Sequence, residues 1–450
     1  MHVIILAAGK GSRMRSRYPK VLQLLGGRPL LEHVLDTAAR LKPEAIHVVV
    51  GHRAEAVRKQ FQDREILWVE QSRQLGTGHA VAQAMDGVPE HTRILVLYGD
   101  MPLCRQEDLV LLLEAGRDRL AVLGMELEDP SGYGRLLCDG DHLQAIVEER
   151  DADGHQKTIR RVNSGIMAGP DSVFRQCTRL EANNRQGEHY LTDLVAMERA
   201  QNRSVALMMS ADADSCLGCN SALDLEQLER VYQRRVVTGL LKQGVRMRDA
   251  SRVDIRGQVY FGHDVELDCN VILEGRCVLG HGVRIGPGCV LRNVNLAAGV
   301  RVEAYSFLED CRVDVQCVIG PFARIRPGTI LAPHCRVGNF VEVKNSRIGQ
   351  GSKINHLSYV GDTHMGAQVN VGAGTITCNY DGASKHVTEI GDDVFIGSNS
   401  ALVAPLVLGD GSTVGAGSTI TQDVAPGALA VERTVTRVVN HWKRPRKPRH

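Results

Sequence analysis

Aliphatic residues recur at every sixth position through most of the second half of the chain. The longest unbroken series is Ile390, Ile396, Leu402, Leu408, Val414 and Ile420. The same interval runs from Leu267 to Leu291 and from Ile325 to Val343. Six matches neither the 3.6-residue period of a helix nor the two-residue period of an ordinary strand. It predicts a left-handed parallel β-helix, in which six residues form one short strand and turn and three such units close a triangular coil around the aliphatic residue.

Two interruptions break this rhythm. The step from Val360 to Met365 is one residue short of a full hexad, and the interval from Cys378 to Glu389 is too long for one. Breaks in a solenoid are often the places where function lies. We therefore expect a site near these interruptions.

The first half of the chain has a different pattern. The apolar runs "HVIIL" (2–6), "IHVVVG" (46–51) and "RILVLYGD" (93–100) are each followed by a turn and an amphipathic segment. This βαβ order predicts a Rossmann-like α/β domain with a mainly parallel mixed sheet, and ligands are expected at the carboxyl ends of its strands.

The change of period sets the expected domain boundaries. We assign 1–221 to the α/β domain, 222–250 to a connecting helix and linker, 251–437 to the hexapeptide-repeat domain and 438–450 to a basic tail. Apolar residues at helical spacing over 222–243 predict the connecting helix. The tail, rich in basic residues and proline, is expected to be solvated, with a contact to the phosphates of coenzyme A as the alternative.

Composition excludes several classes of function. The 450 residues carry 54 basic and 52 acidic side chains, so no global field attracts nucleic acid or a membrane surface. No apolar run is long enough to span a bilayer, and the start lacks the pattern of a signal peptide. Twelve cysteines at this length predict buried thiols in a reducing compartment. We expect a cytoplasmic enzyme; Cys216 and Cys219 are half a zinc site at most, since no second pair has metal spacing.

A glycine-containing loop, "LAAGKGSRM" (6–14), directly follows the first expected strand. Such a loop can bring backbone N–H groups to a phosphate, with Lys10, Arg13 and Lys20 adding positive charge. It is not the dinucleotide fingerprint, because Met14 stands where the third glycine belongs, and it is not a Walker loop. An ordinary strand-to-helix turn is the alternative.

Two further segments belong to the same expected edge of the sheet. In "QLGTGHAV" (74–81), Gly76 and Thr77 stand at a predicted helix start, where backbone groups could read a base or sugar. Asp100 ends the strand of "LVLYGDMPL" and could hold Mg²⁺ through a carboxylate oxygen, or could simply cap a turn.

Polar side chains gather around the interruptions of the solenoid. Arg326 and Lys344 are 18 residues apart, which is one coil, so they should stack about 4.8 Å apart. They could form a phosphate clamp or only a solvated basic stripe. His356 should lie one coil below Ala373, with Tyr359, Asn370, Asn379 and Tyr380 nearby. It could be a general base or a structural histidine.

The motifs of both halves resemble known enzymes. "LxxGxGxRM…PK", "LGTG" and "YGDxP" resemble the sugar-1-phosphate nucleotidyltransferases. "RPGTIL…GNFVEVKNS…GSKINHLSYVGD…NVGAGTITCNYDG…IGSNSALVAP" resembles the acetyltransferase half of the bacterial bifunctional N-acetylglucosamine-1-phosphate uridyltransferase/glucosamine-1-phosphate acetyltransferases. The resemblance covers nearly the whole chain in the same order. Ser12 and Ser164 replace the usual threonines and keep the hydroxyl.

The resemblance implies two reactions that make UDP-N-acetylglucosamine, the precursor of peptidoglycan and lipopolysaccharide. The solenoid would acetylate glucosamine 1-phosphate with acetyl-CoA, and the α/β domain would join N-acetylglucosamine 1-phosphate to UTP and release pyrophosphate, with Mg²⁺ as cofactor. The resemblance also implies a homotrimer formed by the solenoids, with acetyltransferase sites between subunits.

The resemblance further assigns the site residues. His356 is the implied general base. Asp100 and Asn220 are the implied metal ligands. The nucleotide and sugar residues of the uridyltransferase are Leu6, Ala7, Ala8, Gly9, Arg13, Lys20, Gln71, Gly76, Thr77, Tyr98, Gly99, Asp100, Gly134, Glu148, Asn163 and Asn220. The sugar-phosphate residues of the acetyltransferase are Arg326, Lys344, Tyr359 and Asn370. The implied acetyl-CoA contacts are Ala373, Asn379, Tyr380, Ser398, Ala416 and Arg433.

Two other hypotheses remain open from the sequence. In one, the chain is a sugar-nucleotide pyrophosphorylase whose β-helix serves only assembly or regulation. In the other, it is a non-enzymatic scaffold related to nucleotide-exchange subunits. The scaffold hypothesis is disfavoured by the charged residues Lys10, Arg13, Lys20 and Asp100, because a site that no longer catalyses a reaction has no physical need for this arrangement of charge.

Overall fold

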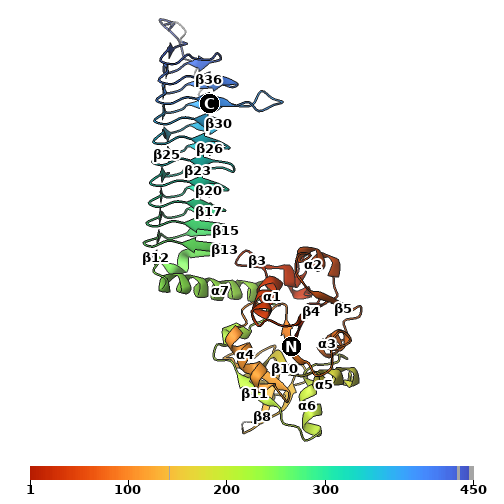
Figure 1. Cartoon of the computed structure of the whole chain (residues 1–450). Coiled ribbons are helices and arrows are strands. Elements are labelled where there is room, and N and C mark those ends of the chain that lie inside the picture. Colours follow the sequence, from red (N-terminus) through yellow and green to blue (C-terminus); the bar gives the residue numbers. More distant parts are fainter. Residues whose placement is uncertain (141, 433–435, 445–450) are drawn as a thin grey trace, which may run out of the picture. The chain divides into compact units, whose positions relative to one another are not determined.

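A computed structural model describes residues 1–140, 142–432 and 436–444 (Figure 1). The chain forms two compact units, Met1–Arg235 and Val236–His450. The division falls within helix α7 (Ala222–Lys242), close to the helix predicted over 222–243.

The amino-terminal unit is built on a mixed sheet, to which the described residues contribute nine strands in the order β11-β7-β10-β6-β1-β4-β5, with β8 paired to β10 and β9 paired to β8. Their bounds are β1 His2–Leu6, β4 Ala45–Val50, β5 Leu67–Glu70, β6 Arg93–Tyr98, β7 Ala121–Glu126, β8 Arg135–Asp139, β9 His142–Val147, β10 Arg161–Pro170 and β11 Ala206–Met209. Strand β1 runs parallel to β4 and β6, whereas β10 is antiparallel to β6 and β7. The predicted mainly parallel mixed sheet is confirmed.

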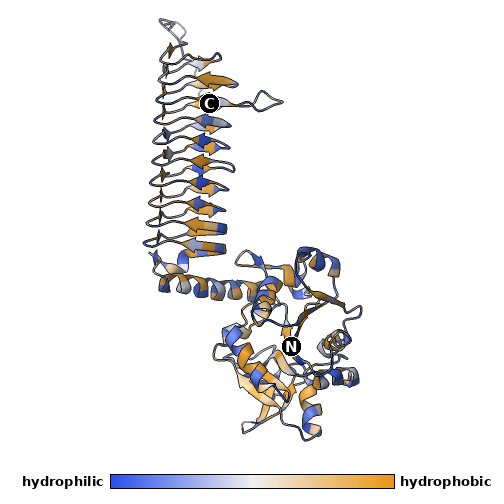
Figure 2. Ribbon diagram, in the orientation of Figure 1, coloured by the Kyte–Doolittle hydropathy of each residue, from blue (hydrophilic) through white to orange (hydrophobic). Residues whose placement is uncertain are grey.

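Helices cover both faces of this sheet. Their bounds are α1 Leu30–Arg40, α2 Ala54–Gln60, α3 Thr77–Met85, α4 Gln106–Ala115, α5 Asp171–Phe174 and α6 Asp193–Ala200. Alternate residues of β1 enter different cores: Val3 and Ile5 pack with residues of α1, α2 and α4, and Ile4 packs with residues of α3, α5 and α6. Figure 2 shows the sheet strands as predominantly apolar, as expected for a sheet buried on both faces. A small hairpin, β2 (Leu24–Leu25) and β3 (Arg28–Pro29), follows the glycine loop.

The carboxyl-terminal unit is a left-handed parallel β-helix with three faces. One face is the 11-stranded sheet of the described residues, formed by β12 Arg246–Met247, β14 Glu266–Leu267, β16 Arg284–Ile285, β19 Arg301–Val302, β22 Val318–Ile319, β25 Arg336–Asn339, β28 Lys353–His356, β31 Asn370–Val371, β34 Phe395–Ile396, β37 Thr413–Val414 and β39 Leu429–Ala430. We call it face 1.

The other two faces share long strands at the start of the solenoid and then separate. Face 2 contains β13 Val253–Phe261, β15 Val271–Leu279, β17 Val290–Arg292, β20 Phe307–Glu309, β23 Arg324–Ile325, β26 Glu342–Lys344, β29 Tyr359–Gly361, β32 Ile376–Cys378, β35 Ala401–Val403 and β38 Thr419–Ile420. Face 3 contains β18 Asn295–Leu296, β21 Arg312–Val313, β24 Ile330–Leu331, β27 Arg347–Ile348, β30 Thr363–Met365, β33 Thr388–Ile390 and β36 Leu406–Leu408.

The interior of the solenoid confirms the six-residue pattern. Every aliphatic residue named for that pattern is buried, from Leu267 to Ile420. The cysteines Cys277, Cys289, Cys311, Cys317 and Cys335 are buried in the same core. Among the residues that the structure describes, no cysteine forms a disulfide. Low aromatic content suits this narrow interior, because small and branched aliphatic side chains fill it without strain.

Both interruptions are visible in the structure. Only Asp362 separates β29 from β30, which accounts for the five-residue step. The chain between β32 and β33 leaves the coil as a projecting loop, residues 379–387 (Figure 1).

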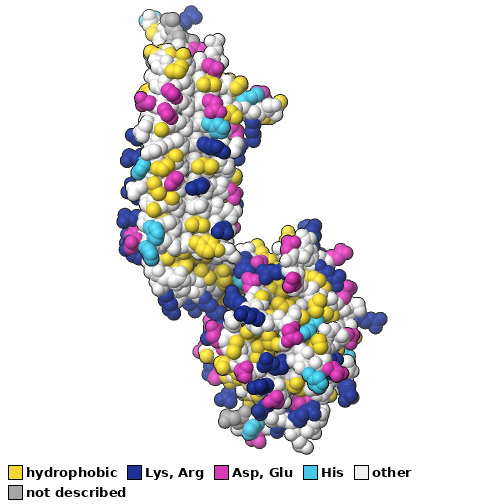
Figure 3. Space-filling view, in the orientation of Figure 1, with side chains coloured by type: hydrophobic (Ala, Val, Ile, Leu, Met, Phe, Trp, Pro, Cys, Tyr) yellow, Lys and Arg dark blue, Asp and Glu magenta, His cyan; other side chains and the backbone are white. Residues whose placement is uncertain are grey.

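The surface does not concentrate one kind of charge on the face in view. Figure 3 shows basic, acidic and apolar side chains interspersed on each unit. In the described part of the chain, no helix combines the length and the apolar character needed to cross a bilayer.

Candidate active sites

The glycine loop after β1 brings Lys20 to the edge of the sheet. The loop backbone is tied to neighbouring segments by Ala7 N donating to Val49 O (2.8 Å). Gly11 has a left-handed backbone (φ +60°), and a Cβ there would lie 2.7 Å from the Cβ of Lys20. A side chain at Gly11 would therefore displace Lys20 from its position.

Lys20, Asp100 and Asn220 meet at the carboxyl ends of β1 and β6. The Lys20 ammonium donates to Asp100 Oδ2 and, at 3.1 Å, to Asn220 Oδ1. Asn220 reaches this position because Cys219 N donates to Asp100 O (2.9 Å). The structure thus gathers two implied metal ligands and one implied phosphate ligand around a single point.

The oxygens at this point suit Mg²⁺. Asp100 offers a carboxylate and Asn220 an amide oxygen, and Mg²⁺ commonly takes one or two protein oxygens and completes its octahedron with phosphate and water. Among the described residues, no group of three or more His, Cys, Asp or Glu side chains could hold a metal by itself. Cys216 and Cys219 are both buried, and burial raises the pKa of Cys219 to about 12, so neither is a ready thiolate ligand.

Arg13 borders the same region from the short turn Ser12–Met14. It lines a cavity of about 390 Å³ together with Asn220, Tyr133 and Asp224. Asp224 Oδ2 accepts hydrogen bonds from the backbone N–H groups of Asn220 and Ser221, which holds the Asn220 segment in place.

A second group of predicted residues surrounds Tyr98, at the end of β6. The Tyr98 hydroxyl is hydrogen-bonded to Thr77, and burial together with the carboxylates of Glu148 and Asp100 raises its pKa. The phenol therefore stays protonated near neutrality. Gly165 allows the ring to sit there, since a Cβ at Gly165 would lie 2.7 Å from the Tyr98 ring.

Glu148 and Asn163 complete this group. Asn163 N donates to Gly134 O (2.8 Å), and the Asn163 side-chain oxygen accepts from Gly165 N (2.9 Å). Burial raises the pKa of Glu148, although its carboxylate accepts a hydrogen bond from Thr192 at 3.1 Å. The chain brings Gly134, Glu148 and Asn163 together as the resemblance implies.

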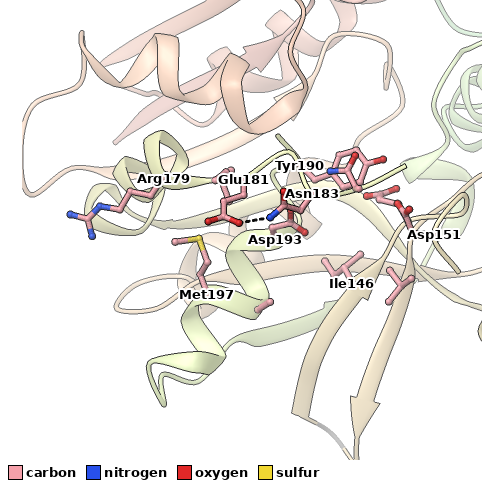
Figure 4. A pocket seen from close by; sticks show the side chains of 13 residues that line it. Ile146, Asp151, Arg179, Glu181, Asn183, Tyr190, Asp193 and Met197 are labelled. Carbon is pink, nitrogen blue, oxygen red and sulfur yellow. Dashed lines mark hydrogen bonds between the residues drawn. The ribbon is translucent and has the colours of Figure 1, made fainter. Parts of the chain in front are cut away.

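Glu148 also lines the larger of the two cavities described for this unit, about 600 Å³. Figure 4 shows Asp151, Tyr190, Asp193 and Met197 around this hollow, with Asn183 donating to Glu181. Burial raises the pKa of Asp193. An open, partly acidic space therefore adjoins the Glu148 group.

Gln71 and Gly76 form the third part of the amino-terminal site. Gln71 directly follows β5, and its Nε2 donates to Gly76 O (3.1 Å). Gly76 has φ +112°, and a Cβ there would lie 2.5 Å from His189 O, so the loop requires glycine.

In the solenoid, His356 ends strand β28 at the corner between faces 1 and 2. Its ring is exposed, and its Nδ1 lies 2.9 Å from Asn339 Oδ1 on the coil below. Because an amide oxygen can only accept, Nδ1 carries the proton in this arrangement. The other ring nitrogen, Nε2, is then unprotonated in the neutral ring and available to take a proton.

Three predicted acetyl-CoA contacts occupy the same corner on successive coils. Strand pairing places Asn339 beside His356 on the adjacent coil. Backbone hydrogen bonds connect the same corner on the following coils into one column: Gly374 N donates to His356 O, Asn399 N to Ala373 O and Gly417 N to Ser398 O. The column from bottom to top is Asn339, His356, Ala373, Ser398 and Ala416. At about 4.8 Å per coil, it extends roughly 14 Å beyond His356.

Arg326 and Lys344 occupy adjacent coils near the opposite edge of face 2, as their spacing predicts. Arg326 is paired with Glu342 (2.7 Å). The pKa of Lys344 is lowered by the neighbouring Lys385, which lies in the projecting loop. Tyr359 points toward this group, since a Cβ at Gly361 would lie 2.3 Å from its hydroxyl.

Asp362 anchors the projecting loop beside these cations. It accepts hydrogen bonds from Asn345 and from Asn379, a predicted site residue. Burial disfavours the charged form of Asp362, but these bonds and the nearby Lys344 outweigh burial and lower its pKa. Tyr380 is exposed in the loop, with its hydroxyl donating to Gly382 O (2.6 Å).

One chain does not bring all predicted acetyltransferase residues together. Asn370 lies on face 1, whereas Arg326, Lys344 and Tyr359 lie on face 2, around the corner that carries His356. Arg433 lies outside the described residues.

Sequence reasoning missed three residues at these sites. Asn339 is 17 residues before His356, so in-register counting of coils could have found it. Lys385 stands in a loop outside the hexads, and Thr192 follows a stretch without periodicity, so no sequence signal pointed to either.

The fold and the two clusters define a class: a nucleotidyltransferase-type α/β unit followed by a hexapeptide-repeat unit. Residues 3–165 match the family model of the MobA-like NTP transferase domain, and residues 387–422 match that of the hexapeptide repeat of succinyl-transferase. The chain is 51% identical over 447 residues to the Bifunctional protein GlmU of Alkalilimnicola ehrlichii, with 99% of this chain and 96% of that protein covered.

The proteins of the same name from Stenotrophomonas maltophilia and Acinetobacter baylyi are 51% and 50% identical, and each alignment covers 99% of this chain and at least 98% of the relative. The chain belongs to the GlmU family of bifunctional proteins.

Proposed function

We propose that the two activities of this family lie in separate units of the chain. The solenoid transfers acetyl from acetyl-CoA to glucosamine 1-phosphate, and the α/β unit then transfers UMP from UTP to N-acetylglucosamine 1-phosphate. The observation that carries the proposal is that each unit has its own polar cluster: Lys20, Asp100 and Asn220 in one, and His356 with Asn339 in the other. In these terms 1–221 is the uridyltransferase domain and 251–437 the acetyltransferase domain, joined by 222–250.

His356 acts as the general base of acetyl transfer. An ammonium has no lone pair, so the sugar amine must lose a proton before it attacks the thioester. Asn339 holds the proton of His356 on Nδ1, which leaves Nε2 to accept that proton. The C–N bond forms, the C–S bond breaks, and coenzyme A leaves as the thiol.

The surroundings of His356 position both substrates. Acetyl-CoA lies along the corner formed by Ala373, Ser398 and Ala416, with the Ala373 backbone near the thioester oxygen. Arg326 and Lys344 bind the sugar phosphate, and Lys385 adds a third cation. The lowered pKa of Lys344 supports this assignment, because two adjacent ammonium groups favour an anion between them. Tyr359 and Asn370 orient the amino sugar, and Asn379, Tyr380 and Arg433 contact acetyl-CoA.

The α/β unit carries out the second reaction. The sugar phosphate oxygen attacks the α-phosphorus of UTP in line, a P–O bond forms, and pyrophosphate leaves. Asp100 and Asn220 would hold Mg²⁺, which would offset charge on the phosphates when bound. Lys20 and Arg13 bind phosphate oxygens. The nucleotide and sugar lie along the loop formed by Leu6, Ala7, Ala8 and Gly9.

The remaining predicted residues bind the sugar and the base. Tyr98, Gly99, Gly134, Glu148 and Asn163 surround the N-acetylglucosamine, and Gln71, Gly76 and Thr77 surround the uridine. The protonated Tyr98 hydroxyl and the raised pKa of Glu148 suit contacts to neutral hydroxyl and amide groups of a sugar.

The functional oligomer is a homotrimer formed through the solenoids. Two observations support self-association. Asn370 lies on a different face from the other sugar-phosphate residues, so sites shared between chains would unite them. The exposed side chains Tyr305, Phe322, Phe340 and Leu357 form an apolar ridge along one corner, and its aromatic rings stack 5.3 and 5.4 Å apart.

Acetyl-CoA and UTP as substrates, together with cysteines that form no disulfide in the described part of the chain, support action in the cytoplasm. The coupled reaction tests the proposal as a whole. Glucosamine 1-phosphate, acetyl-CoA, UTP and Mg²⁺ should yield UDP-N-acetylglucosamine, and omission of acetyl-CoA should abolish it unless N-acetylglucosamine 1-phosphate is supplied. UDP-sugar formation without thiol release from acetyl-CoA would leave the solenoid an assembly module only, and no UTP turnover would favour the scaffold.

Mixed oligomers test the shared sites. Lys344→Ala and Asn370→Ala chains, each inactive in acetyl transfer, should regain part of that activity when they are unfolded and refolded together. Each variant refolded alone is the control. No recovery in oligomers shown by mass spectrometry to contain both chains would contradict sites between subunits.

A further inference from the structure

The amide of Gln71 is held in one orientation by two acceptors. Its Nε2 lies 3.1 Å from Gly76 O and 2.9 Å from His79 Nδ1. A backbone carbonyl oxygen can only accept a hydrogen bond, so the side-chain atom facing Gly76 is the amino group and not the amide oxygen. One of the two hydrogens on Gln71 Nε2 is therefore donated to Gly76 O.

The second hydrogen points to His79, in the first turns of α3. Since the amino group has no lone pair to offer, His79 Nδ1 must be the unprotonated ring nitrogen. The ring stacks against His189 with centroids 6.4 Å apart. Burial and the nearby His189 lower the pKa of His79, which keeps its ring neutral. His189 is fixed in turn, because its Nδ1 lies 2.7 Å from Leu180 O.

This arrangement leaves Gln71 Oε1 as an acceptor without a donor. Oε1 receives no hydrogen bond from any residue that the structure describes. It is also not one of the fully buried side-chain atoms that lack a hydrogen-bond partner in that part of the chain, so it remains accessible to a ligand. The Gln71 backbone lies close to the glycine loop, since a Cβ at Gly51 would be 3.1 Å from both Gln71 O and the Cβ of Ala8. An acceptor-only group therefore borders the region where the nucleotide is proposed to bind.

We propose that His79 is the positioning residue that locks the Gln71 amide, so that this site accepts uracil and rejects cytosine. Uracil has a hydrogen on N3 and can donate to Oε1, whereas cytosine has a lone pair on N3 that would face Oε1. A rotated amide would present its amino group and favour cytosine instead. The inference rests on the proposed uridyltransferase function and concerns its choice of nucleotide.

Two substitutions separate the acceptor from the packing. His79→Phe keeps a ring against His189 and removes Nδ1, and His79→Asn restores an acceptor oxygen near the same place. The measured quantity is the ratio of kcat/KM for UTP to that for CTP, with N-acetylglucosamine 1-phosphate and Mg²⁺. We expect His79→Phe to lower this ratio at least about tenfold, since a site built around a hydrogen bond discriminates through that bond. His79→Asn should recover most of the ratio.

The controls keep the result interpretable. His155→Leu, at an exposed histidine of the same unit, should leave the ratio unchanged. Acetyl transfer by the solenoid should be unaffected in every variant. With the unmodified chain, UTP methylated at N3 should bind at least about tenfold more weakly than UTP, a measurement that does not depend on any variant folding.

The outcomes distinguish this inference from the function on which it rests. No UDP-sugar from UTP by the unmodified chain would overturn the proposed function. Uridylyl transfer with an unchanged UTP/CTP ratio in a folded His79→Phe variant would overturn the role of His79 alone. Equal use of UTP and N3-methyl UTP would overturn the reading of the base by Gln71.

Discussion

The two units assemble their sites in opposite ways. In the α/β unit, Lys20 bonds to Asp100 and Asn220, which are 80 and 200 residues away along the chain. In the solenoid, Asn339 and His356 are 17 residues apart and lie on adjacent coils. The first site depends on the topology of a whole sheet, and the second on the pitch of a repeat. A local change in the solenoid should therefore stay local, and a change in the sheet should not.

The largest expected effect tests the independence of the two sites. His356→Ala should lower acetyl transfer about 10³-fold, because no other group takes the proton of the amine, and should leave uridylyl transfer unchanged. Thiol release from acetyl-CoA and pyrophosphate release measure the two rates. His364→Ala, at an exposed histidine of strand β30 on face 3, is the matched control. Near-normal acetylation by the His356 variant would remove this histidine from its role.

The reverse experiment addresses the α/β unit. Asp100→Ala should lower uridylyl transfer about 100-fold or more and weaken its dependence on Mg²⁺, since it removes the carboxylate oxygen offered to the metal. Acetyl transfer should persist. Asp63→Asn, at an exposed position, serves for comparison. Normal UDP-sugar formation with normal Mg²⁺ dependence in the Asp100 variant would rule out the metal assignment.

Truncation of one core side chain in each unit tests how far a local loss of stability spreads through that unit. Leu95→Ala in β6 and Leu291→Ala in β17 each remove a fully buried side chain, at a cost of about 3 kcal/mol. Hydrogen exchange should show faster exchange across the whole α/β sheet for Leu95→Ala, but only in the coils next to the cavity for Leu291→Ala. Leu111→Ala, on an exposed face of α4, should change neither pattern. Loosening of the entire solenoid by Leu291→Ala would refute the local behaviour.

The smallest expected effect concerns pH and only the α/β unit. His2 Nδ1 and His47 Nε2 lie 2.9 Å apart in the buried interior, and burial, with His2 adding to it, lowers the pKa of His47 to about 4. The unfolded chain then binds more protons between pH 4 and 6.5, so stability falls as pH falls through that window. Between pH 7 and 5 the loss should be about 2 kcal/mol.

Trp68 fluorescence in a Trp442→Phe background reports urea unfolding of this unit, because the chain has only two tryptophans. His47→Gln should flatten the pH dependence. The measurements end at pH 5 so that the ion pair between the amino terminus and Glu44 stays charged over the whole range. A midpoint independent of pH between 7 and 5 would contradict the buried histidine pair as its source.

The fold of the solenoid follows almost completely from the amino-acid sequence. A six-residue period admits one register, and that register places Arg326 beside Lys344 and His356 below Ala373 without any knowledge of the rest of the chain. The α/β class also follows from the sequence, because segments 2–6 and 93–100 contain the unbroken apolar runs 3–6 and 94–97, and glycines follow in their turns.

The atoms that face one another across long sequence separations could be identified only from the folded chain. It placed Lys385 next to Lys344, turned the Gln71 amide toward His79, and divided Asn370 from Tyr359 by a corner of the solenoid. These contacts depend on loop paths and side-chain hydrogen bonds. Loop paths and side-chain hydrogen bonds produce no periodic pattern in the sequence, because they form only after the strands that carry them have paired.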